Sequence, residues 1–301
     1  MHFTDPLYSN PMIRPIPLLE VTQGCTHNKC AFCNMYKSVR FRPSPSEWVE
    51  ADIRELAVRN PGATRLELVG ANPFCLSFER LDAIMDLINE NLPKVSWVGC
   101  AGRVTDVRNK TVNELKMLRQ KGLAAVWLGV ESGDDWTLER MNKGYTSADI
   151  LEQTARLDEA GISYWMTFLN GAAGTSHSRE HAINSAKVFS ACNPVLVGCA
   201  GLVLFGDTDL AAQAERGEFD PLDERGLLEE LKLFVENLEC DPVTFMTAHT
   251  SPASLNGTGI FGGDGTTFQD HKAEIVSEME SSLTYTDFDR QGQARAMKRS
   301  L

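Results

Sequence analysis

Residues 17–33 read PLLEVTQGCTHNKCAFC, an apolar run that leads directly into three cysteines, Cys25, Cys30 and Cys33. Three thiolates this close repel one another unless a cation or a cluster neutralises them, so the C-x4-C-x2-C spacing calls for a metal centre. Structural zinc normally takes four protein ligands, whereas this chain has no second C-x2-C pair and His27 is poorly placed for the same ion. A cubane iron–sulfur cluster on three cysteines leaves one iron open, and an open iron implies chemistry. Structural zinc or a storage cluster stays the alternative.

Short apolar runs alternate with helix-period segments from residue 17 to about 205. The runs are nearly continuous in hydrophobicity, as expected of strands that are covered on both faces. Between them lie amphipathic segments such as 81–92, and residues 44–47 (SPSE) and 111–114 (TVNE) have the capping-box spacing that begins a helix. Repeated strand–helix units predict an α/β fold whose parallel sheet curls into a partial (β/α)6 TIM-like barrel. The expected strands are 17–22, 64–70, 95–100, 124–130, 163–169 and 195–205.

The last third of the chain predicts a short α/β cap. Residues 206–222 are polar and acidic and are expected to form a surface loop. The elements expected after it are a helix at 223–238, a strand at 243–248, a Gly/Thr/Ser-rich loop at 250–267 and a last helix at 268–282. No clean linker and no long repeat is visible, so we expect one domain. Its parts are an N-terminal extension at 1–16, the barrel core at 17–222 and the cap with its tail at 223–301.

Composition narrows the class of protein. The 301 residues are 43% hydrophobic, which is enough to bury a sizeable core. The chain has 29 Lys and Arg against 41 Asp and Glu, and the net charge of −12 argues against broad nucleic-acid binding and against anionic lipid surfaces. The other five cysteines are scattered through apolar surroundings, and no export signal is visible at the start. We therefore expect a cytoplasmic protein without a membrane segment.

The three cysteines directly follow the first expected strand, and in this arrangement the sequence resembles the radical SAM (S-adenosylmethionine) superfamily. The family's usual signature is C-x3-C-x2-C with an aromatic residue before the last cysteine, the place of Phe32 here, and this chain has one extra residue before Cys30. Further motifs resemble the branch that includes oxygen-independent coproporphyrinogen oxidase, the Elongator catalytic subunit and the methylthiotransferases. They are Val69-Gly70-Ala71-Asn72, Gly129-Val130-Glu131-Ser132-Gly133, Leu169-Asn170-Gly171-Ala172-Ala173-Gly174 and Phe205-Gly206-Asp207-Thr208.

The resemblance implies two cofactors, a 4Fe-4S cluster and SAM, and the residues that hold them. The three cysteines would ligate iron, and the backbone of residues 70–72 would bind the SAM amino group, because small residues allow close approach. Glu131 would accept hydrogen bonds from the SAM ribose, with capping of the next helix as the alternative. Arg103 would pair with a carboxylate, with a solvated place on the barrel rim as the alternative. The expected SAM contacts are Phe32, Gly70, Ala71, Asn72, Arg103, Glu131, Ser132, Val203 and Leu204, and no catalytic residue is assigned.

The resemblance also implies an activity. A radical SAM enzyme cleaves SAM reductively to a 5′-deoxyadenosyl radical, which abstracts hydrogen from a substrate, and it receives its electron from a flavodoxin- or ferredoxin-type donor. No second cysteine set and no RNA-binding extension are visible, which favours a small-molecule substrate at the barrel mouth. The alternative function is that of a non-catalytic iron–sulfur or zinc protein that has kept the fold.

Overall fold

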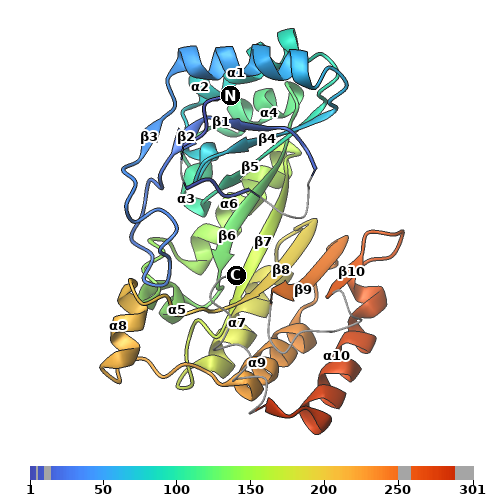
Figure 1. Cartoon of the computed structure of the whole chain (residues 1–301). Helices are drawn as coiled ribbons and strands as arrows, with labels where there is room; N and C mark the ends of the chain where they lie inside the picture. The colour runs from blue at the N-terminus through green and yellow to red at the C-terminus, as the bar shows by residue number, and fades with distance from the viewer. Residues whose placement is uncertain (5, 10–14, 250–258, 289–301) are drawn as a thin grey trace. The chain divides into compact units, whose positions relative to one another are not determined.

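The structure is a computed structural model that describes residues 1–4, 6–9, 15–249 and 259–288 (Figure 1). Backbone contacts divide the chain into two compact units. Unit 1 contains Met1–Gly129 and Glu152–Trp165, and unit 2 contains Val130–Leu151 and Met166–Leu301. The division falls within strands and helices, so each unit is built from more than one segment of the chain.

The main sheet is mostly parallel, and its strands follow the order β1-β4-β5-β6-β7-β8-β9-β10. The pairs β1–β4, β4–β5, β5–β6 and β8–β9 are parallel, whereas β10 pairs antiparallel with β9. Parallel neighbours need a crossover connection, which the helices between the strands supply. The strands are β1 (Leu18–Glu20), β4 (Arg65–Val69), β5 (Trp97–Gly102), β6 (Leu123–Glu131), β7 (Ser163–Asn170), β8 (Leu196–Gly201), β9 (Thr244–His249) and β10 (Ile260–Gly262).

Unit 1 packs amphipathic helices against its strands. Helix α1 (Ser46–Arg59) contacts β1 and α2 (Phe78–Asn91), and α2 contacts α4 (Val112–Gln120). The buried face of α2 includes Leu81, Ile84 and Ile88, the positions that the helical period predicts. Helix α4 begins with the expected capping box, since the Thr111 hydroxyl accepts the Glu114 N–H at 3.2 Å. The unit also contains the short helices η2 (Pro73–Cys75) and α3 (Val104–Val107) and most of α6 (Ser147–Ala160).

Three tryptophans of unit 1 stack on one face of its strands. The ring centroids of Trp97 and Trp127 lie 6.2 Å apart, and those of Trp127 and Trp165 lie 5.3 Å apart. Gly99 leaves room for the first pair, because a Cβ there would lie 2.5 Å from both rings. The three rings therefore form an aromatic row along the sheet.

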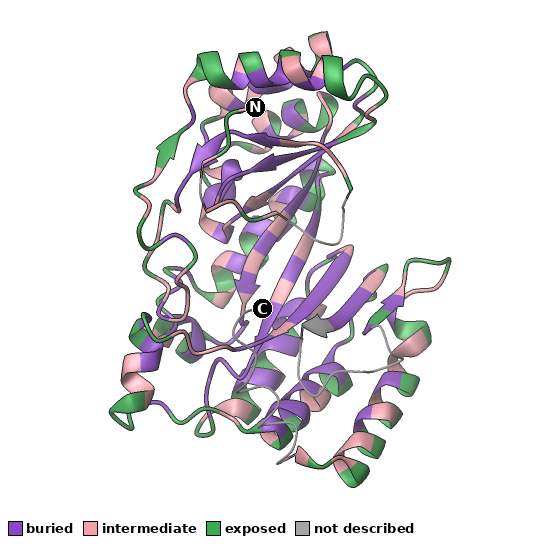
Figure 2. Cartoon of the chain, viewed as in Figure 1, coloured by how far each residue is buried: buried purple, intermediate pink, exposed green. Residues whose placement is uncertain are grey.

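Unit 2 has its core where its helices meet. Helix α9 (Glu224–Asn237) packs on both α7 (Ser178–Ser190) and α10 (Phe268–Tyr285). Phe234 of α9 stacks on Phe168 with centroids 4.0 Å apart and meets Phe189 edge-on. Figure 2 shows this burial on the inner sides of the helices, with exposed residues on their outer sides. Within the part of the chain that the structure describes, no helix has both the length and the apolar character needed to cross a bilayer.

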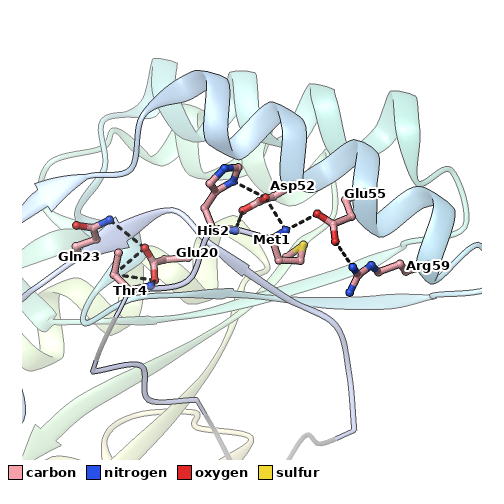
Figure 3. A network of polar contacts seen from close by, with 8 residues as sticks. All are labelled: Met1, His2, Thr4, Glu20, Gln23, Asp52, Glu55 and Arg59. Carbon is pink, nitrogen blue, oxygen red and sulfur yellow. Dashed lines mark hydrogen bonds and ion pairs between the residues drawn. The ribbon is translucent and has the colours of Figure 1, made fainter.

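The first residues of the chain are held to β1 and α1 by a polar network (Figure 3). Asp52, buried on α1, accepts the backbone N–H of His2 at 2.8 Å. Glu20 of β1 accepts both the backbone N–H and the hydroxyl of Thr4, at 2.8 and 2.9 Å. It also accepts the side-chain amide of Gln23 at 3.1 Å. Two buried carboxylates thus anchor the N-terminal segment to the strand that leads into the cysteines.

Two boundaries near the end of the predicted barrel differ from expectation. Residues 206–222 contain helix α8 (Asp209–Glu215) instead of a loop, because the Thr208 hydroxyl caps it and accepts the Ala211 N–H at 3.3 Å. Strand β8 ends at Gly201 and not at 205. The chain turns there, and the Phe205 carbonyl accepts the Thr208 N–H at 2.9 Å.

Two further predictions are wrong in detail. Helix α1 begins after Pro45 without a side-chain cap, so the predicted box at 44–47 does not form. Strand β10 lies within the 250–267 stretch that was expected to be a loop. It forms because Ile260 and Phe261 pair with β9 across the sheet. Residues 250–258 of that stretch lie outside the described residues.

Candidate functional site

The three cysteines lie in a loop that leaves the sheet directly after β1. The strands β2 (Thr22–Gln23) and β3 (Arg42–Pro43) pair antiparallel and close this loop at its base. Gly24 follows with a φ of +65°, and a Cβ there would lie 2.7 Å from the Val39 carbonyl oxygen. Only glycine fits where the chain turns into the cysteine loop. The loop follows the carboxyl end of a parallel strand, where such sheets carry their ligands.

The cysteines of this loop are available as ligands. All eight cysteines of the chain lie in the described part, and none of them forms a disulfide. Cys25, Cys30 and Cys33 are half-buried. Asn28 adopts a φ of +49° and directs its backbone N–H to the Cys25 sulfur at 3.4 Å. The thiolate is the form of cysteine that binds metal, and the Asn28 N–H is placed to donate to this sulfur.

Three cysteines are, by their chemistry, ligands of an iron–sulfur cluster. Within residues 1–4, 6–9, 15–249 and 259–288, no three His, Cys, Asp or Glu side chains are grouped as the ligands of one metal ion. A cubane cluster makes a different demand, because each cysteine ligates a separate iron and the sulfurs stand further apart. Three thiols on one loop would leave its fourth iron open to an external ligand. The chemistry of the loop therefore agrees with a 4Fe-4S cluster.

Iodoacetamide at pH 8 is expected to label the loop cysteines of the metal-free protein before the others. Burial raises the pKa of Cys75 and of Cys240 to about 12. At pH 8, each of these two thiols is therefore ionised in only about one protein molecule in ten thousand. Peptide mass spectrometry after a short pulse measures the order, and loading with iron and sulfide should protect the loop. Labelling of Cys75 or Cys240 ahead of Cys30 would contradict this arrangement.

The turn after β4 carries the stretch expected to bind the SAM amino group. Gly70 has a φ of +127°, and a Cβ there would lie 2.2 Å from the hydroxyl of Thr22. Glycine is thus required by the close approach of β2, whatever else binds here. Asn72 is buried, and its side chain accepts the Thr26 N–H at 3.3 Å. The side chain is therefore engaged within the protein, while the role of the backbone at 70–72 stays a prediction.

Arg103 follows β5 and stands at the start of α3. Its backbone N–H donates to Asp106 at 2.8 Å. Burial raises the pKa of Asp106, while burial lowers the pKa of Lys110, which is 1% exposed. The Lys110 ammonium donates to the Phe74 carbonyl at 2.7 Å. Sequence reasoning found Arg103 but missed these two buried residues, Asp106 and Lys110; the available signal for Asp106 was its place between Val104 and Val107.

Glu131 ends β6 in unit 2 with a φ of +69°. This left-handed conformation costs a non-glycine residue about 1–2 kcal/mol, and such strain concentrates at ligand sites. Its carboxylate accepts the Thr167 hydroxyl at 3.0 Å and lies 3.7 Å from the ammonium of Lys143. The alternative that Glu131 caps the next helix is wrong. Asp134 caps α5 (Asp135–Arg140) and accepts the Thr137 N–H at 2.9 Å.

Two neighbours of Glu131 have clear structural roles. Ser132 is buried, and its hydroxyl accepts the Asp134 N–H at 3.0 Å, so it shapes the turn. Lys143 is 4% exposed and faces Glu131, and sequence reasoning missed it. The available signal was a lone lysine before Gly144 and Tyr145, in a stretch that reads as a turn. A buried lysine is rare without a charged partner, and here the partner is the predicted SAM contact.

The remaining expected contacts are divided between the two units. Phe32 is half-buried on the cysteine loop of unit 1. Val203 and Leu204 belong to unit 2 and lie beyond β8, half-buried in the segment that leads to α8. In the same unit, the N–H of Gly171 donates to Glu230 of α9 at 2.5 Å, so the glycine-rich loop after β7 is held by the C-terminal part of the chain. Contact of these residues with SAM stays a prediction.

Two curated proteins are similar to this chain over about half of its length. The heme chaperone HemW of Bacillus subtilis (strain 168) is 25% identical over 169 residues, which are 54% of this chain and 44% of that protein. The anaerobic magnesium-protoporphyrin IX monomethyl ester cyclase of Cereibacter sphaeroides is 31% identical over 159 residues, 52% of this chain and 25% of that protein. The chain thus spans less than half the length of these relatives.

A solved structure shares the fold. Coproporphyrinogen III oxidase (HemN) from Escherichia coli, a radical SAM enzyme, matches with a TM-score of 0.55 and 17% identity, over 74% of this chain and 52% of that one. This likeness confirms the predicted fold class of a partial barrel of the radical SAM type. The family model of the radical SAM superfamily matches residues 19–187, from β1 through the cysteine loop and Glu131 to α7. Because that match covers more than half of the chain, the protein belongs to the radical SAM superfamily, with a 4Fe-4S cluster and SAM as its cofactors.

Proposed function

We propose that the protein cleaves SAM reductively and abstracts hydrogen from a small-molecule substrate. The observation that carries the proposal is the loop after β1, which places three half-buried cysteines, none of them in a disulfide, on a base that only Gly24 allows. When bound, the cluster and SAM supply a one-electron cleavage that yields methionine and a 5′-deoxyadenosyl radical, the species that takes hydrogen. The residues of the chain bind and orient these groups.

Each predicted residue has a defined task in this proposal. Cys25, Cys30 and Cys33 hold three irons of the cluster, and the backbone at 70–72 receives the SAM amino group. Glu131 accepts the ribose hydroxyls. Its carboxylate is already placed by the Thr167 hydroxyl, 3.0 Å away, so little reorganisation is needed when SAM binds. The ammonium of Lys143 lies 3.7 Å from the same carboxylate and pairs with it.

Glu131→Gln is expected to raise the KM for SAM about tenfold, because a neutral amide accepts weaker hydrogen bonds and loses its pairing with Lys143. Iron content should not change, since Glu131 is not an iron ligand. Initial rates of 5′-deoxyadenosine formation at varied SAM concentration measure the effect. Glu159→Gln is the matched control, because Glu159 is exposed and pairs only with the surface residue Lys116 among the contacts described. Equal KM values for the two variants would refute the role of Glu131.

Anaerobic reconstitution tests the proposed function itself. The purified protein is loaded with iron and sulfide, given SAM and dithionite, and assayed for 5′-deoxyadenosine. Formation that depends on the cluster supports the enzyme. Four bound irons without cleavage would support a non-catalytic binding protein, and zinc in place of iron would remove both cluster functions.

The proposal extends to partners and location. The two curated relatives have different roles, since one is a chaperone and the other a cyclase. Similarity to them therefore does not identify a substrate. A small molecule is favoured by the net charge of −12, which disfavours phosphate backbones. The electron is proposed to come from a flavodoxin- or ferredoxin-type donor. Eight cysteines without a disulfide among them support the proposal of a reducing, cytoplasmic location.

A further inference from the structure

The segment between Cys25 and Cys30 is one residue longer than the family's usual spacing, and the structure shows what holds it. Thr26 is bound twice by the side chain of Asn72, which accepts the Thr26 N–H at 3.3 Å and donates to its hydroxyl at 2.7 Å. Asn28 is bound separately, because its side-chain amide donates to the Tyr36 carbonyl at 2.8 Å. The longer segment is therefore tied to the rest of unit 1 at two points.

Asp106 determines how Asn72 is oriented. The Asn72 amide nitrogen donates to Asp106 Oδ2 at 2.9 Å, and the same oxygen accepts the Arg103 N–H at 2.8 Å. Oδ2 therefore acts as an acceptor of two N–H groups, which holds the nitrogen of Asn72 toward Asp106 and leaves the oxygen of Asn72 to accept the Thr26 N–H. Asn72 is 2% exposed and Asp106 is 4% exposed, so the bond between their side chains is shielded from water.

We propose that Asn72 and Asp106 are positioning residues of the iron–sulfur site, which fix the longer segment between Cys25 and Cys30 through Thr26. The contact joins the loops that follow β1, β4 and β5, all within unit 1. Without it, Thr26 would lose its bonds to Asn72, and Cys25 would be held less firmly relative to Cys30. We call the hydrogen bonds from Asn72 to Thr26 and to Asp106 the brace. The brace forms in the protein chain without a cofactor, and only its effect on the cluster rests on the proposed function.

Hydrogen exchange of the metal-free protein tests the brace directly. Asn72→Leu keeps the size of the side chain but removes every hydrogen bond to Thr26, so the Thr26 amide should exchange about tenfold faster. Asp106→Leu should give the same result by releasing the Asn72 amide. Asp106→Asn should keep the slow exchange, because its amide oxygen can take the place of Oδ2. Mass spectrometry of peptides that span residues 25–30 measures the rate.

Thr111→Val is the matched control, because it removes the cap of α4 in the same unit without touching the cysteine loop. It is expected to lower stability while leaving exchange at residues 25–30 unchanged. Wild-type exchange in Asn72→Leu would overturn the brace, and so would equal acceleration in Thr111→Val. This result stands even if the protein cleaves no SAM, so the two proposals fail separately.

The electronic state of the reduced cluster tests the positioning role. In the reconstituted protein, Asn72→Leu and Asp106→Leu should alter the electron paramagnetic resonance spectrum of the reduced cluster. Asp106→Asn and Thr111→Val should keep the wild-type spectrum. Identical spectra in all four variants at equal iron content would show that the brace is structural only and would overturn the positioning role.

Discussion

Cys30→Ala is expected to reduce 5′-deoxyadenosine formation more than about a hundredfold, because two thiols cannot hold a cubane cluster with one open iron. Cys30 lies on a loop whose base is built by the β2–β3 pair and Gly24. Apart from the other two expected ligands, Cys25 and Cys33, no described cysteine lies on that loop to replace it. Bound iron should fall to the background of the metal-free protein. Iron analysis and product quantification after anaerobic reconstitution check both expectations.

Cys240→Ala is the control for this experiment. Cys240 is 8% exposed and belongs to unit 2, outside the cysteine loop. Its replacement should keep iron content and SAM cleavage near wild type, at a small cost in stability. Thermal unfolding of both metal-free variants separates loss of ligand from loss of fold. Full iron content and undiminished cleavage in Cys30→Ala would refute the assignment of the cysteines.

Gly70→Ala is expected to lower the free energy of unfolding by about 3 kcal/mol. The added Cβ would lie 2.2 Å from the Thr22 hydroxyl and 2.3 Å from the Thr22 carbonyl oxygen, and the φ of +127° is unfavourable for alanine. Relief requires the backbone of β2 to move, and β2 leads into the cysteine loop. Iron incorporation should therefore fall together with stability. Urea unfolding of the metal-free protein measures the first effect and iron analysis the second.

Gly62→Ala makes the same chemical change where there is space. No heavy atom lies within 4 Å of the Cβ that it would add, and Gly62 is not among the glycines with positive φ. Its free energy of unfolding should stay within about 0.5 kcal/mol of wild type. If both alanine variants unfold at the same urea concentration, the close approach of β2 to Gly70 does not constrain the fold.

The fold was largely predictable because its strands are buried on both faces. Six continuous apolar runs correspond to β1 with β2 and to β4, β5, β6, β7 and β8. Short polar elements were not predictable in the same way. Helix α8 depends on a single threonine cap, and β10 owes its conformation to a partner strand about sixteen residues earlier in the chain. The hydrophobic periodicity of a sequence reveals neither a helix cap nor the partner of a short strand.

The parts of the site that depend on the spacing of neighbouring residues were predictable from the sequence. The cysteine run and the motif at Glu131 identified the family and its cofactors, which the family match confirms. Residues that act through distant partners stayed hidden. Thr167 reaches Glu131 across 36 positions, and Asn72 reaches Thr26 across 46. Such pairings arise only when parallel strands bring their ends to one edge of the sheet.

The bond between Glu230 and Gly171 bears on how the protein can be shortened. A chain trimmed before α9 would leave the Gly171 N–H without its acceptor, and the Asn170 amide would lose the Leu227 carbonyl, 3.0 Å away. Each buried donor deprived of its partner costs about 1–3 kcal/mol. Helix α9 is thus a structural partner of the glycine-rich turn and not a detachable module. Minimal versions for crystallography or directed evolution should retain it.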